Sequence, residues 1–102
     1  MYTRPDKEES DIYHLAARFS RELRGKVSKA QYIDVVYGVH FVPSLQKIVN
    51  QAMNRAWKKV FGKNMGHDAS TIYIVERTIL VFKKQAQDAY ERFHLVRIVG
   101  EA

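Results

Sequence analysis

The chain has 102 residues, enough for one hydrophobic core and too few for a second of useful size. Its 17 Lys and Arg exceed its 11 Asp and Glu, which gives a formal charge of +6, and a field of this sign concentrates polyanions. Because there is no cysteine, disulfides, thiolate zinc sites and cysteine nucleophiles are excluded.

The first predicted element is a helix over residues 10–24. Residues 1–9 contain Pro5 and mixed charges without periodicity, so we expect a flexible lead-in. Ser10 is predicted to cap the helix and Gly25 to end it. Its apolar positions recur at helical spacing and are Ile12, Leu15, Ala16, Phe19 and Leu23.

A second helix is predicted to begin at a capping box. Ser28 has the side chain for the N-cap, and Gln31 stands three residues later, where its amide can reach back. The helix is expected to end near Gly38 or His40. Residues 32–42 are rich in Val, Ile and Tyr and would also suit a strand.

The third predicted helix begins at Pro43, runs to Phe61 and is closed by Gly62. Apolar and cationic residues separate onto opposite sides of it. The expected core side holds Leu45, Ile48, Val49, Ala52, Ala56 and Val60, and the opposite side holds Lys47, Gln51, Arg55 and Lys58.

A long fourth helix is predicted after a cap at Asp68 or Ser70 and is expected to end at Gly100. Residues 71–82 are apolar almost all round, so they form either a strand or the buried central helix. The predicted core stripe holds Ile72, Val75, Ile79, Phe82, Ala86, Ala89, Phe93 and Val96.

These elements predict an all-α fold, a small bundle of four to five helices with a long C-terminal helix in a single domain over residues 10–102. Gly25, Gly62 and Gly100 recur at nearly equal intervals, which raises the hypothesis of two related helical halves, 10–62 and 63–102. Because the segments share little identity, three ordinary glycine helix ends are the favoured interpretation.

The sequence gives little support for catalysis. His14, His40, His67 and His94 are scattered, without the spacing of a metal site or a catalytic triad. We therefore expect no enzyme activity, catalytic residue, metal, cofactor or small-molecule substrate. The polar N-terminus and the lack of a long apolar run predict a soluble, cytoplasmic protein that does not bind membranes.

Basic residues on two predicted helices favour binding to the phosphates of DNA or RNA. Trp57 and Phe61 lie at the edge of the third helix, where an aromatic ring either stacks on an unpaired base or covers the core. The predicted phosphate-binding residues are Arg18, Arg21, Lys47, Gln51, Arg55, Lys58, Lys59 and Lys63.

The basic all-helical pattern, with KVSKAQYIDVVYG at residues 26–38 and AYERFHLVRIVGEA at residues 89–102, resembles the small subunit of CRISPR effector complexes. The resemblance covers the whole chain in length and has no specific motif. It implies a helical bundle that contacts neighbouring subunits, serves antiviral defence and holds nucleic acid with basic side chains. It would place on nucleic acid Arg18, Arg21, Lys47, Arg55, Lys58 and Lys59.

Two alternatives remain open. Residues 17–36 have the helix, glycine turn and helix of a helix-turn-helix DNA-binding regulator, with Ser28, Lys29 and Gln31 at the start of the recognition helix. The chain could instead be a protein–protein interaction module of viral or phage type that binds a host protein in a groove between two helical halves. In either case we expect contact with other protein subunits or self-association.

Overall fold

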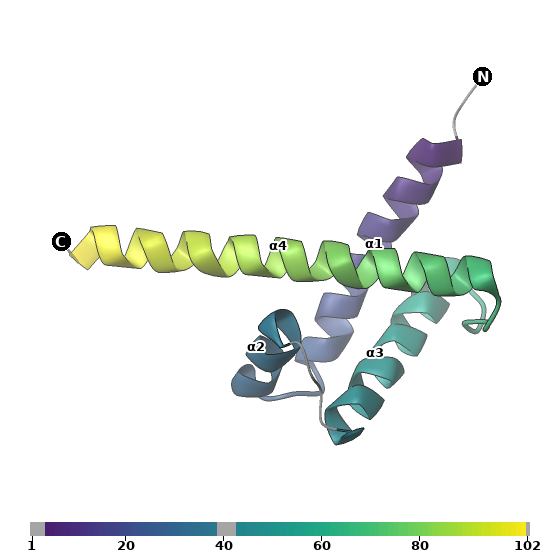
Figure 1. Cartoon of the computed structure of the whole chain (residues 1–102), viewed down its shortest axis with the longest axis horizontal. Helices are drawn as coiled ribbons and strands as arrows, with labels where there is room; N and C mark the ends of the chain where they lie inside the picture. Colours follow the sequence, from purple (N-terminus) through teal and green to yellow (C-terminus); the bar gives the residue numbers. More distant parts are fainter. Residues whose placement is uncertain (1–3, 39–42, 102) are drawn as a thin grey trace.

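Four helices and no strand make up the described part of the chain, so the predicted all-α fold is confirmed (Figure 1). The computed structural model describes the backbone of residues 4–38 and 43–101 and the side chains of residues 7–38 and 43–92. The helices are α1 (Arg4–Arg24), α2 (Lys29–Tyr37), α3 (Pro43–Phe61) and α4 (Ala69–Glu101).

Helix α1 begins six residues earlier than the sequence predicted. The lead-in is therefore wrong for residues 4–9, and Ser10 lies inside the helix instead of capping it. Pro5 is tolerated because a first-turn N–H has no intrahelical partner. Glu8 and Glu9 stand near the positive end of the helix dipole, and Lys7 Nζ lies 3.5 Å from Asp11 Oδ2 one turn on.

The central element of the fold is α1. Its residues Leu15, Ala16, Phe19 and Leu23 are at most 1% exposed. Helix α3 packs along one side of α1, α4 crosses it on another, and α2 contacts both α1 and α4 (Figure 1). The hydrophobic core thus lies around α1.

The prediction that the first half of α4 is the buried centre is wrong. Ile72 is 50% exposed, Tyr73 52% and Leu80 61%. In Figure 1, α4 lies in front of α1, and no other helix lies in front of α4. Because α4 packs on the other helices with one side only, its outward apolar residues stay in contact with solvent.

The buried side of α4 agrees with the predicted stripe at Val75, Ile79, Phe82 and Ala86, which are buried or partly buried against the core, but not at its start. Thr71, Thr78 and Phe82 are buried, whereas the predicted Ile72 faces outward. Thr78 Oγ1 donates to the Ile74 carbonyl at 2.7 Å, so this hydroxyl is satisfied inside the core. The ring of Phe82 meets Phe19 edge to face at 4.9 Å and Tyr32 at 5.8 Å.

The ends of α4 are only partly as predicted. Asp68 Oδ1 accepts from the Thr71 backbone N–H at 2.8 Å, which makes Asp68 the N-cap. Residues 71–82 are helical, so the strand alternative is wrong there. Gly100 lies within the helix, and the predicted end at this residue is also wrong. Ala89 is exposed, and the side chains of Phe93 and Val96 lie outside the described ones.

The predicted boundaries of α2 and α3 are confirmed. Ser28 Oγ accepts from Gln31 N at 3.1 Å, and Gln31 Oε1 accepts from Ser28 N at 2.9 Å, which completes the capping box. Helix α2 ends at Gly38, and the strand alternative fails for residues 32–37, while 39–42 lie outside the described residues. Gly62 ends α3 at φ 74°, a backbone conformation that favours glycine.

Residues 10–62 contribute three helices and residues 63–102 only one, so the two stretches do not share a fold. The molecule measures 51 × 39 × 22 Å, and its shortest dimension is about that of two helix layers. Within the described residues, no helix has the length and apolarity that crossing a membrane requires.

Candidate nucleic-acid interface

The outward side of α3 is a cationic ridge. The helix has four basic residues and no acidic one. Its inward side holds the predicted core residues, which are buried or partly buried. Lys47, Gln51, Arg55 and Lys59 follow one another at intervals of four residues, are all exposed and form what we call the α3 ridge. The ridge is about 18 Å long at 1.5 Å per residue.

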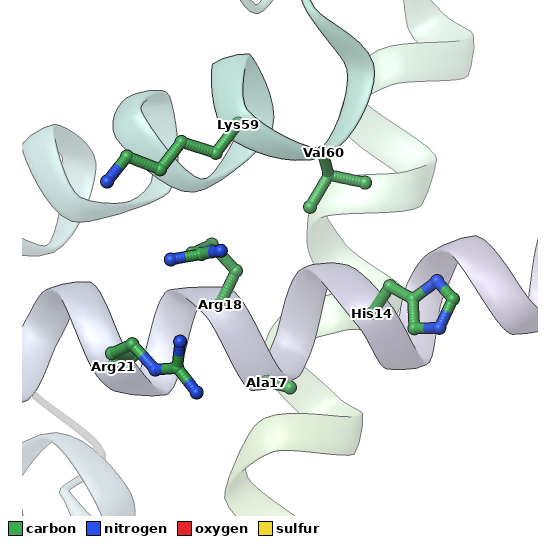
Figure 2. Close-up of a pocket in the computed structure, with 6 residues that line it drawn as sticks. All are labelled: His14, Ala17, Arg18, Arg21, Lys59 and Val60. Atoms are coloured by element: carbon green, nitrogen blue, oxygen red, sulfur yellow. The ribbon is translucent and has the colours of Figure 1, made fainter.

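An open pocket of about 310 Å³ lies between α1 and α3, at one end of the α3 ridge (Figure 2). Three cationic side chains line it, two from α1 and one from α3. The complete lining is His14, Ala17, Arg18, Arg21, Lys59 and Val60. The structure thus brings together basic residues that the sequence placed on two separate helices.

The position of the two arginines follows from the pattern of α1. Arg18 and Arg21 are one turn apart and alternate with the buried positions Phe19 and Leu23, so they point away from the core. Arg21 is exposed and Arg18 half-buried. Over the described residues, neither guanidinium forms an ion pair. Their charge is therefore available to an anion in the pocket.

One acidic residue, Glu22, lies beside the basic side chains of this pocket. Its Oε2 lies 3.3 Å from Lys59 Nζ, and its side chain is only 11% exposed. The carboxylate ties the end of α3 to α1 and offsets part of the charge of Lys59. Glu22 was not predicted to take part, although its place between Arg21 and Arg24 shows that the basic stretch of α1 is interrupted.

Trp57 does not lie where a base could stack on it. Its side chain is 5% exposed, and its ring packs at 4.5 Å between centroids against Phe61, which is partly buried. The burial of Trp57 therefore supports the core interpretation of this aromatic pair over base stacking. The physical reason is that Trp57 follows Met53 and Ala56 on the inward side of α3.

The remaining predicted residues lie around the ridge. Lys58 is exposed in the last turn of α3, where a cation also complements the negative end of the helix dipole. Lys63 is exposed in the loop that follows Gly62. The pKa of Asp68 is lowered mainly by hydrogen bonds from Thr71, with a smaller contribution from Lys63.

The structure leaves few residues of α2 that could contact base edges, as the helix-turn-helix alternative requires. Ser28 and Gln31 bond each other in the capping box, and Val35 and Val36 are buried. Among the nine residues of α2, Lys29 is the single basic one, and it is exposed. A helix with so few free polar groups is a poor reader of base edges.

Two further findings bear on function. Among the described residues, no three His, Asp or Glu side chains gather closely enough to hold a metal ion. Comparisons with protein-family models, with curated proteins and with solved structures found no match.

Proposed function

We propose that this chain is a non-catalytic nucleic-acid-binding protein that holds phosphates with the α3 ridge and the pocket beside it. The observation that carries the proposal is the convergence of Arg18, Arg21 and Lys59 on one open pocket. This pocket continues into a helix face without a single carboxylate. Lys, Arg and Gln side chains at such a face donate hydrogen bonds to phosphate oxygens. The cationic ones also displace counterions from the nucleic acid.

The geometry supports contact with a nucleic-acid backbone in preference to base recognition. The α3 ridge is about 18 Å long, which matches the rise of roughly five base pairs along a duplex strand. No aromatic ring is exposed on the ridge, since Trp57 is in the core. Contacts of this kind are independent of sequence, and the proposed ligand is therefore DNA or RNA of mixed sequence.

Within this class, we place the chain as the small subunit of a CRISPR effector complex in the cytoplasm. The support is the resemblance of its sequence pattern, the helical bundle and the gathering of Arg18, Arg21 and Lys59 at one pocket. A helix-turn-helix regulator ranks second because α2 has few free polar residues. The test is native purification: the small subunit co-purifies within a large ribonucleoprotein, whereas a lone regulator does not.

Direct binding tests the phosphate proposal. We expect the affinity for a fluorescent oligonucleotide, measured by anisotropy, to fall linearly on a log–log plot against salt concentration. Arg21→Glu combined with Arg55→Glu places repulsive charges in the pocket and on the ridge. This double variant should lower the affinity by roughly tenfold or more and reduce the salt slope by about 2.

The matched control is Lys7→Glu combined with Lys29→Glu, which removes the same charge outside the proposed interface. Both lysines are exposed, and a glutamate in the first turn of α2 is compatible with the helix dipole. We expect this control to lose much less affinity. Binding that is absent, insensitive to salt or equally weakened in both double variants would overturn the proposal.

A further inference from the structure

The outer side of α4 offers a second surface that phosphate binding does not use. Tyr73 and Leu80, two turns apart, are each more than half exposed. No helix lies in front of this side in Figure 1. Apolar side chains that stand this far out of a small protein mark an interaction surface when they share one helix face.

Five residues form one stripe along this side, at intervals of three, four, four and three residues. They are Tyr73, Glu76, Leu80, Lys84 and Gln87, and we call them the α4 stripe. All are exposed except Gln87, which is partly buried. Spacings of three and four keep side chains on one helix seam, as in two-stranded coiled coils. The order of the intervals is the same in both directions, with Leu80 at the centre.

We propose that the α4 stripe pairs with the α4 stripe of a second copy of this chain, antiparallel, with a two-fold axis at Leu80. In this arrangement each residue meets the residue equally far on the other side of Leu80. Glu76 of one copy lies opposite Lys84 of the other, and Tyr73 lies opposite Gln87. Leu80 packs on its own counterpart. Such a self-complementary surface is what a two-fold dimer requires.

The charges favour a second copy over a foreign partner. Within one α4 stripe, the acidic and the basic residue stand at equal distances on opposite sides of Leu80. An acidic or a basic partner would match one of them and repel the other, whereas an antiparallel copy matches both. Each dimer therefore gains two pairs of opposite charge around a central apolar contact.

Helix α2 reaches the α4 stripe only at Gln87, and the other four residues of the stripe are exposed. Lys83 Nζ donates to the Gly38 carbonyl at 3.2 Å, and Gln87 Nε2 donates to the Val36 carbonyl at 2.9 Å. These bonds hold the end of α2 to one flank of α4. In Figure 2, α4 is the pale green helix behind α1 and α3, away from the basic pocket. Pairing through α4 would therefore leave the pocket of each copy accessible.

Sedimentation velocity over a range of protein concentrations tests this inference without any nucleic acid. The paired segment is a short part of one helix, so its interface lies at the small end of stable ones and we expect dissociation at micromolar concentrations. Leu80→Glu places two carboxylates together at the axis, and we expect a monomer at every concentration. Tyr13→Glu is the control, because Tyr13 is exposed on α1 and outside the stripe.

A charge swap distinguishes antiparallel pairing from unspecific association. Glu76→Lys alone, or Lys84→Glu alone, sets like charges opposite each other twice per dimer and should weaken dimerisation by roughly tenfold or more. The double variant restores opposite charges and should recover dimerisation. Circular dichroism checks that each variant keeps the helical fold. A wild-type monomer at all concentrations, a dimer that Leu80→Glu leaves intact, or a swap without recovery would overturn the inference.

Discussion

The outer sides of α3 and α4 are both exposed, yet they offer a partner different chemistry. The α3 ridge presents Lys, Gln and Arg side chains without a carboxylate, whereas the α4 stripe alternates apolar residues with one charge of each sign. A surface of one sign suits a polyanion, and a surface of balanced charge around a leucine suits its own copy. We therefore propose separate roles for these two surfaces.

The largest expected effect comes from removing the contact that holds α4 to the core. Phe82→Ala deletes the ring that meets Phe19 and Tyr32, and it should lower the free energy of unfolding by roughly 3–5 kcal/mol. Both surfaces would then be lost together. Urea unfolding followed by circular dichroism measures the change.

Leu80→Ala is the control for the outer side of the same helix. Leu80 is exposed, so its truncation should change the free energy of unfolding of the monomer by less than about 0.5 kcal/mol. Equal losses for the two variants would contradict the division of α4 into a packed and an open side.

The next effect concerns the charge of the α3 surface. Glu22→Gln removes the carboxylate that lies 3.3 Å from Lys59 Nζ, which leaves this lysine free to contact phosphate. We expect a several-fold tighter oligonucleotide complex and a salt slope steeper by about 1. Anisotropy titrations at several salt concentrations measure both. Weaker binding by Glu22→Gln would show that Lys59 acts only as a partner of Glu22.

A spectroscopic prediction tests the position of Trp57, the single tryptophan of the chain. Because the indole is buried against Phe61, a bound base does not stack on it. We expect little change in tryptophan fluorescence when a saturating oligonucleotide is added. Strong quenching upon binding would mean that a base reaches the ring and that the core position of Trp57 is lost in the complex.

The smallest effect is expected at the turn between the two surfaces. Hydrogen bonds from Thr71 lower the pKa of Asp68 in the folded state. The ionised carboxylate therefore contributes stability above the pKa of the unfolded chain, and this contribution is lost as the pH falls below about 4. Asp68→Asn still caps the helix but does not titrate. Thermal unfolding at pH 6 and pH 3 should show a slightly smaller acid loss for this variant than for the wild type.

Local signals in the sequence were enough for α2 and α3, because the capping box, Pro43 and Gly62 act through neighbouring residues. Helical periodicity also predicted Val75, Ile79, Phe82 and Ala86 on the buried side of α4, but not which residue is buried at the start of the helix. Thr71 is buried and the adjacent Ile72 is exposed, because the crossing of α4 over α1 decides which side of α4 faces the core. The start of α1 was missed because Ser10 has a cap's chemistry, although the helix already begins before it.

The candidate site shows the same limit. Exposure of the α3 ridge followed from helical periodicity alone. The meeting of Arg18 and Arg21 with Lys59 depends on the packing of α1 against α3, and the pairing of Lys59 with Glu22 is a contact between residues 37 positions apart. Trp57 stood at a helix edge in the sequence pattern, and the structure shows that this edge, with Met53 and Ala56, belongs to the buried side of α3.

The most direct test of the separation between the two surfaces is a backbone NMR titration of the labelled protein with a short single-stranded oligonucleotide. We predict that the amides that shift most belong to residues 17–22 and to the outer side of α3 from Lys47 to Lys59. The amides from Tyr73 to Lys84 should shift little. Shifts concentrated on α4, or no saturable shifts at low salt, would contradict the account.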